Sequence, residues 1–220
     1  CQHFVNGKQT DDQSDDQTFT ITVDPVNDEP SFTKGADQTV LEDAGAQTVS
    51  AWATATSAGP ANESSQTLSF NVSNDNNSLF SAKPSVDPAT AHLTFSPAED
   101  ANGTATVTIS VSDNGGTSNG GDDQSDDQTF TITVDPVNDE PSFTKGADQT
   151  VNEDVGAQTV SAWAADLSEG PANEAGQTLS FNISNDNNAL FTDQPSVDPA
   201  TGDLTFTPAL NVNGSATVTI

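Results

Sequence analysis

Carboxylate and amide side chains recur in this sequence in short groups that suit the binding of a divalent cation. Calcium in proteins takes roughly six to eight oxygen ligands from carboxylates, amide side chains and backbone carbonyls. The candidate ligands in the first half are Asn27, Asp28, Glu29, Glu42, Asp43, Glu63 and Asp113, and those in the second half are Asp135, Asn138, Asp139, Glu140, Glu153, Asp154 and Glu174. These residue types predict a site for Ca2+.

Catalysis is harder to place, because histidine and cysteine are scarce. His3 lies in an N-terminal stretch that does not recur, and His92 is replaced by Asp203 in the second half. Cys1 is the single cysteine, so no disulfide can form within the chain. No Cys-His pairing is possible within the repeat, and a Ser-His-Asp site would need a histidine that only one copy has. A carboxylate pair of the glycosidase type stays open on composition, but an active site copied in tandem is unusual, and we expect no enzyme.

The elements that must position these residues repeat with a period of 111 residues. Residues 11–109 align with residues 122–220 without a gap and differ at 20 of 99 positions. Residues 11–40 recur unchanged as residues 122–151, whereas residues 1–10 match nothing in the other copy. Such a period is typical of a tandem array of structural modules.

Within one period, short runs that alternate polar and apolar residues predict β-strands. The clearest runs are residues 18–23, 67–72, 93–95 and 104–111. Alternation with period two indicates a sheet that is buried on one face. About seven short strands in about 110 residues predict an all-β fold of tandem Greek-key β-sandwich modules, of cadherin or immunoglobulin type, arranged end to end.

A linker with two prolines separates the modules at residues 24–30 and again at residues 135–141. Proline stiffens such a junction. Residues 1–29 are predicted to hold an unmatched leader, the last strand of a preceding module (about 17–24) and a linker; residues 30–140 a complete module and linker; and residues 141–220 a second module without its final strand. The first strand, the linker and the long strand can then converge at a junction, with the candidate ligands between them.

The formal net charge of −29 limits the partners of this chain. It contains four lysines and no arginine. Nucleic acids and anionic membrane surfaces both require basic residues, so we expect neither as a partner. No apolar run is long enough to span a bilayer, so no direct membrane insertion is expected. The acidity fits either a surface adapted to high salt or a set of carboxylates that bind a cation.

The sequence Val-Asp-Pro-Val-Asn-Asp-Glu-Pro-Ser-Phe at residues 23–32 resembles the junction of cadherin-like repeats, in which an Asn-Asp pair before proline binds interdomain calcium. The strings at residues 42–45, 59–63 and 112–116 resemble those of tandem repeats in large bacterial surface and secreted adhesins. This resemblance covers residues 11–220. It implies an exported, extracellular or cell-surface rod that calcium stiffens between neighbouring modules of the same chain, and that spaces a distal binding domain from the cell.

One position departs from the resemblance. Animal cadherins carry an aspartate two residues before the asparagine, and here Pro25 and Pro136 occupy that place. The nearest acids, Asp24 and Asp135, are one residue further back. We therefore expect one or two ions at each junction rather than three.

Simpler interpretations of the same residues stay open. Asn-Asp before proline is also an ordinary turn, and the acidic stretch 122–127 is typical of a solvated loop. Trp52 and Trp163 fit a hydrophobic core better than a sugar-stacking platform, because alanines flank them.

Two other functions also stay open. The modules could bind a glycan or a cell-surface protein directly, and residues 54–56 and 165–167, the most variable patch, are the place to look. Alternatively, residues 17–24 could complete the second module of a neighbouring molecule by adding a strand.

Overall fold

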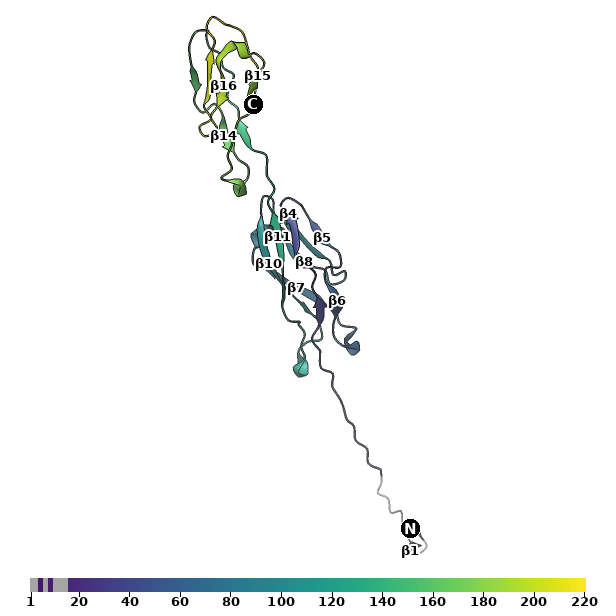
Figure 1. The fold of residues 1–220 in the computed structure, drawn as a ribbon. Coiled ribbons are helices and arrows are strands. Elements are labelled where there is room, and N and C mark those ends of the chain that lie inside the picture. Colours follow the sequence, from purple (N-terminus) through teal and green to yellow (C-terminus); the bar gives the residue numbers. More distant parts are fainter. Residues whose placement is uncertain (1–3, 6–7, 10–15) are drawn as a thin grey trace.

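The computed structural model describes residues 4–5, 8–9 and 16–220 and shows two β-modules placed end to end (Figure 1). A two-stranded hairpin of β1 (Phe4–Val5) and β2 (Lys8–Gln9) lies at the N-terminal end. The other regular elements are strands and three-residue 3-10 turns. The prediction of an all-β fold in tandem modules is confirmed. Among the residues described, no helical segment has the length and apolar character needed to cross a membrane.

The first module is a sandwich of a four-stranded and a three-stranded sheet. The larger sheet has the order β4 (Gln38–Leu41), β11 (Gln128–Asp135), β10 (Gly103–Ser112) and β7 (Ser69–Asn74). The smaller sheet has the order β5 (Gln47–Val49), β9 (Leu93–Pro97) and β8 (Phe80–Val86). A separate antiparallel pair joins β3 (Ser31–Thr33) to β6 (Thr54–Ser57), and the 3-10 turns are η1 (Ala61–Glu63), η2 (Asn77–Leu79) and η3 (Ser118–Gly120).

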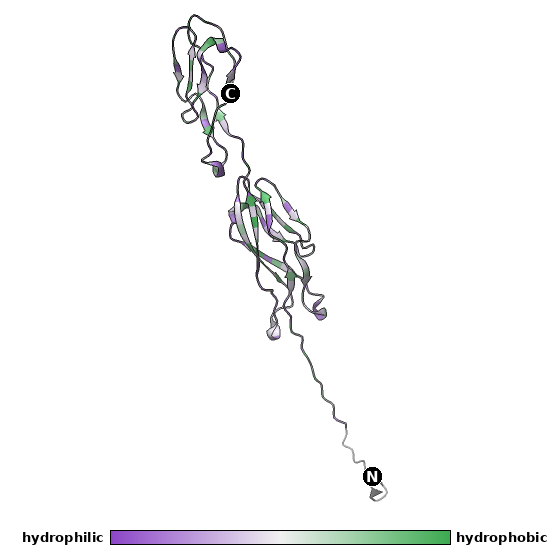
Figure 2. Ribbon diagram, viewed as in Figure 1, coloured by the Kyte–Doolittle hydropathy of each residue, from purple (hydrophilic) through white to green (hydrophobic). Residues whose placement is uncertain are grey.

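β10 and β11 show why the sequence alternates. Val107 of β10 pairs with Phe130 of β11, and both side chains are buried. Their neighbours Thr108 and Thr129 are more exposed, because successive side chains of a strand point to opposite faces. Figure 2 shows the same mixture of hydrophobic and hydrophilic residues along the strands. The runs predicted at residues 67–72, 93–95 and 104–111 correspond to β7, β9 and β10.

The pairing of β11 with β4 is parallel, whereas β11 pairs with β10 in the antiparallel sense. Because β4 comes early in the module and β11 comes last, their parallel arrangement sends the chain in at one end and out at the other. Figure 1 shows the linker leaving β11 toward the second module. This topology places a junction at each end of the sandwich.

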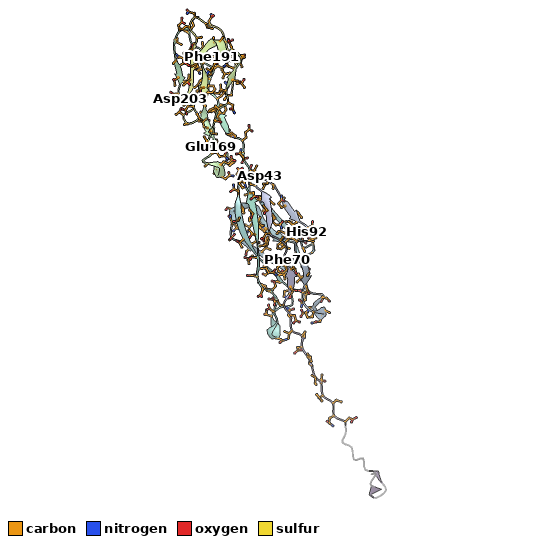
Figure 3. The ribbon with its side chains drawn as sticks, in the orientation of Figure 1. Asp43, Phe70, His92, Glu169, Phe191 and Asp203 are labelled. Atoms are coloured by element: carbon orange, nitrogen blue, oxygen red, sulfur yellow. The ribbon has the colours of Figure 1, made fainter. Side chains whose placement is uncertain are left out.

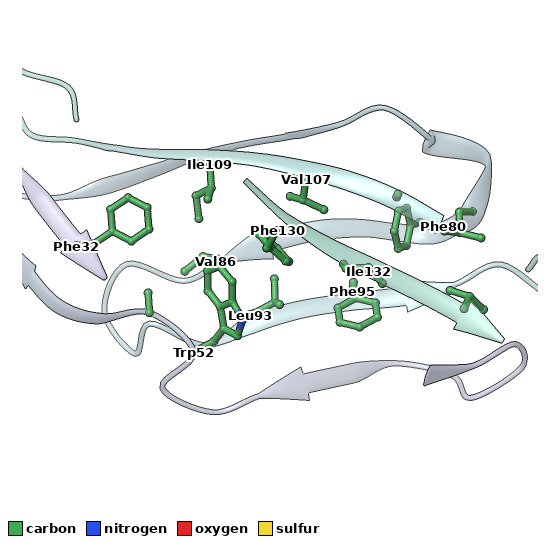
Figure 4. Packing of buried hydrophobic residues seen from close by; sticks show 14 of the residues in the cluster. Phe32, Trp52, Phe80, Val86, Leu93, Phe95, Val107, Ile109, Phe130 and Ile132 are labelled. Atoms are coloured by element: carbon green, nitrogen blue, oxygen red, sulfur yellow. The ribbon is translucent and has the colours of Figure 1, made fainter. Parts of the chain in front are cut away.

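Aromatic side chains fill the centre of the first module (Figure 4). The rings of Trp52 and Phe130 lie 4.4 Å apart between centroids, and Phe80 meets Phe95 edge to face at 6.1 Å. The Trp52 indole Nε1–H donates to the carbonyl of Ala36 at 2.9 Å, so its polar atom is satisfied inside the core. Trp52 is therefore a core residue.

The second module repeats this plan with shorter strands. It contains β12 (Ser142–Thr144), β13 (Gln158–Val160), β14 (Ala165–Ser168), η4 (Ala172–Glu174), β15 (Ser184–Asn185), η5 (Asn188–Leu190), β16 (Phe191–Val197), β17 (Leu204–Pro208) and β18 (Val218–Thr219). The sheet β13–β17–β16 keeps the order of β5–β9–β8, and β12 pairs with β14 as β3 pairs with β6.

The larger sheet is the part that differs between the modules. β18 has two residues where β10 has ten, β15 has two where β7 has six, and residues 149–152 form no strand where β4 lies in the first module. Among residues 141–220, all of which are described, no strand takes the place of β11. Because β11 lies between β4 and β10, its absence removes the hydrogen-bonding partner of both neighbours.

Residues 18–29 run as an extended chain outside any sheet. Phe19, Ile21 and Val23 are 85%, 75% and 88% exposed. Their counterparts in the repeat, Phe130, Ile132 and Val134, form the buried face of β11. The assignment of this segment to a preceding module stays a prediction. The unmatched leader, residues 1–10, lies largely outside the described residues.

Candidate metal centre at the module junction

Glu42 connects the first module to both the linker and the second module. It follows β4 directly, and its side chain is 1% exposed. Its backbone N–H donates to the carbonyl of Asp135 at 2.9 Å, which continues the pairing of β4 with β11. Its Oε1 accepts from the backbone N–H of Val137 at 2.7 Å, and Asn173 Nδ2 donates to Oε1 at 3.1 Å and to Oε2 at 3.2 Å.

Glu174 holds the linker from the side of the second module. It ends the turn η4 and is 6% exposed. Its Oε1 accepts the backbone N–H of Asp139 at 2.8 Å. Its Oε2 and Asp139 Oδ2 are buried and accept no hydrogen bond. A buried carboxylate oxygen without a donor is costly, so these two oxygens are suited to a cation.

Gly170 allows Glu174 to reach the linker. Its φ of +139° lies in the region that favours glycine. A Cβ at this position would overlap Glu174 Oε2 and would lie 3.5 Å from the Asp139 Cβ. Pro171 follows with φ −62°, and its carbonyl accepts the N–H of Glu174 at 3.0 Å. The string Gly-Pro-Ala-Asn-Glu therefore has a local structural reason: it turns the chain so that Glu174 faces Asp139.

Asp43, Asp100 and Asp139 bring three more carboxylates together. One oxygen of each lies within 4.8 Å of the other two. Asp43 and Asp100 belong to the first module and Asp139 to the linker, and Figure 3 shows Asp43 at the end of the first module that faces the second. The backbone N–H of Asp100 donates to Asp43 Oδ1 at 3.2 Å. Both residues have positive φ, 61° and 55°, so two left-handed turns aim these side chains.

The electrostatics of this cluster are repulsive. Desolvation raises the pKa of Asp139 above its usual value, and the charges of Asp100, Glu174, Asp43 and Glu42 raise it further. Desolvation, followed by the charge of Asp43, likewise raises the pKa of Asp100. Within the described part of the chain the single ion pair is Lys145 with Asp148 at 3.2 Å, so no basic residue neutralises the cluster by direct contact.

The donor set matches the preference of calcium. Glu42, Asp43, Asp100, Asp139 and Glu174 offer only oxygen atoms, and hard cations such as calcium take oxygen ligands, whereas zinc and copper favour nitrogen or sulfur. The unpartnered Oε2 of Glu174 and Oδ2 of Asp139 provide an observation that is independent of the clustering itself. The residues at this junction therefore fit a calcium ion.

Four other first-half candidates, Asn27, Asp28, Glu63 and Asp113, lie together at the opposite end of the first module. Asp28 N–H donates to Glu63 Oε1 at 3.0 Å, as Asp139 does to Glu174. Asn27 Nδ2 donates to Asp113 Oδ1 at 3.0 Å. Glu63 is 5% exposed, and Glu63 Oε2 and Asp113 Oδ2 are buried without a hydrogen-bond partner. This end thus has the linker-side half of the arrangement seen at residues 135–141.

The remaining candidates are spread out. Glu29 Oε1 accepts the N–H of Asp126 at 3.1 Å and so holds the acidic loop 122–127, and Asp154 Oδ1 accepts the N–H of Asn211 at 2.8 Å at the far end of the second module. Three linker residues, Asp135, Asn138 and Glu140, have exposed side chains and lie outside the three-aspartate cluster. Glu153 is exposed beside Asp154. Of the predicted ligands, the junction brings together Glu42, Asp43, Asp139 and Glu174.

Asp100 was absent from the predicted ligands. Its counterpart in the other copy is Asn211, so the repeat does not mark this position as consistently acidic. The available signal was the pair Glu99-Asp100 in the turn before β10, directly ahead of Ala-Asn-Gly. Acid pairs are common in this chain, and the contact with Asp43 depends on a turn 57 residues away.

No family model matches the sequence, and no curated protein matches it. Among solved structures, a match is found to the structure of mouse clustered PcdhgC3 EC1-3. The identity is 14%, the TM-score is 0.33, and the match covers 83% of this chain and 57% of that chain. At this level of similarity, the solved structure gives no information about the metal site of this chain.

Proposed function

We infer that this chain is a structural extender whose modules are held in line by calcium at their junction. One observation carries the proposal: carboxylates of the first module, the linker and the second module converge at one place, and two of their buried oxygens have no partner. A non-catalytic role in an exported, adhesin-type protein agrees with the repeat and with the resemblance of its motifs to adhesin repeats.

The residues have distinct parts in this function. Glu42 already fixes the linker through Val137 and the second module through Asn173. Asp43, Asp100, Asp139 and Glu174 would complete the set of calcium ligands. When bound, calcium supplies the positive charge that offsets their mutual repulsion. Without it, the repulsion among these carboxylates favours bending at the linker.

Calorimetric titration of the 220-residue chain with calcium tests the proposal. We expect binding with a dissociation constant of about 10⁻⁴–10⁻³ M, as is usual for extracellular calcium modules. At millimolar calcium this affinity stabilises the bound form by on the order of 1 kcal/mol per site. Asp139→Ala and Asp100→Ala should each weaken or abolish binding at the junction.

Asp148→Ala is the matched control, because Asp148 has a 99% exposed side chain and lies outside the cluster. The variant removes one carboxylate from the same module and should bind calcium like the wild type. Equal calcium binding by the wild type, Asp139→Ala and Asp148→Ala would show that the junction is not the site.

A further inference from the structure

The turn that follows β9 in the first module and β17 in the second has the same shape in both copies of the repeat. Asp100 and its counterpart Asn211 both have a left-handed backbone, with φ of 55° and 56°. The backbone N–H of Asp100 donates to Asp43 Oδ1 at 3.2 Å, and that of Asn211 donates to Asp154 Oδ1 at 2.8 Å. The two copies therefore build one turn on the same hydrogen bond.

The shape of this turn does not explain why Asp100 carries a charge. Aspartate and asparagine both tolerate a left-handed backbone better than most residues do. The shared hydrogen bond uses the backbone N–H at this position and not its side chain. Asn211 shows that the turn forms without a carboxylate. The copies therefore differ at this position in charge and not in backbone conformation.

The charge of Asp100 lies among the candidate calcium ligands. One of its carboxylate oxygens lies within 4.8 Å of oxygens of Asp43 and Asp139. Glu174, which accepts the N–H of Asp139, is 6% exposed, and its Oε2 has no hydrogen-bond partner among the residues described. An asparagine side chain offers an oxygen but no negative charge. Because the calcium affinity of an oxygen-ligand site depends on the number of charged ligands, exchange of this one residue should change the affinity.

We propose that the residue at this turn position sets how tightly a module junction binds calcium. Aspartate, as in the first copy, gives the tighter site, and asparagine, as in the second copy, gives the weaker one. The preceding residue changes in the same direction, because Glu99 is replaced by Leu210. The turn of the first copy thus brings two negative charges that the turn of the second copy lacks. This inference rests on the proposed calcium function and adds to it that the two copies encode different affinities.

Calorimetric titration of the 220-residue chain and its Asp100→Asn variant with calcium tests the inference. The variant should fold, because Asn211 occupies the same turn. Binding at the junction is the part of the heat signal that Asp139→Ala removes. We expect Asp100→Asn to raise the dissociation constant of this site roughly tenfold, because one charged ligand is lost while its oxygen is kept. The double variant Glu99→Leu/Asp100→Asn, which carries both charge changes of the second copy, should bind at least as weakly.

Asp127→Asn is the matched control, because it removes one charge from the same module at a distance from the junction. Asp127 is exposed and directly precedes β11, whereas the linker follows β11. The eight residues of β11 span about 26 Å. This variant should therefore bind calcium like the wild type. Equal weakening by Asp127→Asn and Asp100→Asn overturns the inference, because the effect would then come from net charge.

Thermal unfolding in chelator separates the charge of Asp100 from a role in the turn. Loss of one of three neighbouring carboxylates relieves repulsion, so Asp100→Asn should melt at or above the wild-type temperature. A lower melting temperature would mean that the side chain serves the turn, and it overturns the inference. Equal calcium affinity of the wild type and Asp100→Asn overturns the inference but leaves the proposed function intact. A wild-type chain that binds no calcium overturns both.

Discussion

Glu42 and Glu174 are buried carboxylates, whereas most other acidic side chains of the described residues are at least partly exposed. Burying an ionised carboxylate is unfavourable unless donors or a cation compensate. Backbone N–H groups of Val137 and Asp139 supply part of that compensation, at 2.7 Å and 2.8 Å. Asn173 Nδ2 donates to both Glu42 oxygens, but Glu174 Oε2 and Asp139 Oδ2 have no donor, and the neighbouring aspartates are acceptors only. The junction is therefore unfavourable without a cation.

Asp139→Asn should reveal this conflict, because its effect on the melting temperature should have opposite signs in chelator and in calcium. The raised pKa of Asp139 means that the folded state holds its proton more tightly than the unfolded chain does, so the ionised form destabilises the metal-free fold. In chelator at neutral pH, the variant should melt at or above the wild-type temperature. As the pH falls toward the usual aspartate pKa of about 4, the difference should close.

In millimolar calcium the order should reverse, because the variant lacks one ligand charge. Differential scanning calorimetry at several pH values, with and without calcium, measures all four conditions. A variant that is less stable than the wild type in chelator at neutral pH would contradict the repulsion on which the prediction depends.

Gly170→Ala should weaken calcium binding by displacing Glu174. The substitution adds backbone strain of about 1–3 kcal/mol at a positive φ, and its Cβ would also overlap Glu174 Oε2. Gly176→Ala is the matched control, because Gly176 has φ +116° but no atom lies within 4 Å of the place that a Cβ would take. Thermal unfolding should show strain in both variants, while titration should show weaker calcium binding only in Gly170→Ala.

Several candidate ligands could be predicted from the sequence, whereas Asp100 could not. Glu42 and Asp43 follow a strand, Asp139 lies in the linker and Glu174 lies in a turn, and each of them recurs in the other copy of the repeat. Asp100 joins them through a turn between β9 and β10 whose counterpart carries Asn211. Burial was also invisible in the sequence, since it arises from packing of the second module and the linker against Glu42.

At the scale of elements, the second module as described lacks counterparts of two strands of the first, β4 and β11. Buried core residues in the first module come from both sheets, whereas the second retains Ala164, Val197, Leu204 and Phe206 as its buried cluster. A hydrophobic core stabilises in rough proportion to the apolar area that it buries. The second module should therefore unfold first.

The matched pair Leu204→Ala and Leu93→Ala tests this order, because the two leucines are counterparts in β17 and β9 and are 7% and 0% exposed. Each change should destabilise its own module by about 2–5 kcal/mol. In calorimetry, Leu204→Ala should lower the midpoint temperature of the first of two transitions, and Leu93→Ala should lower that of the second. A single transition that both variants shift equally would contradict independent unfolding.

Strand prediction worked where alternation was strong and failed where a partner strand decided the outcome. Residues 104–109 lie within β10, yet their nearly identical counterparts, residues 215–220, contribute only the two residues of β18. Sequence pattern gives the buried face of a strand, but its length depends on a hydrogen-bonded neighbour. The 3-10 turn η4 also had no clear periodic signal, because it is only three residues long.

For the whole molecule, the proposed function predicts that calcium changes shape more than secondary structure. Small-angle scattering should give a longer maximum dimension in calcium than in chelator, because ligands on both sides of the linker limit bending. Circular dichroism should change little. Asp139→Ala should give, in both buffers, the scattering profile that the wild type gives in chelator. A wild-type scattering profile that does not change when calcium is chelated would contradict stiffening.

The parallel pairing of β4 with β11 has a mechanical consequence. A pull along the rod enters the first module near β3 and leaves it through β11, so the force acts along the axes of β4 and β11. Their hydrogen bonds, from the Ile132–Gln38 pair to the Glu42 N–H on Asp135, would then be loaded together in shear. Unzipping, which breaks one bond at a time, would require force across the strands. The module is thus built to resist tension along its length.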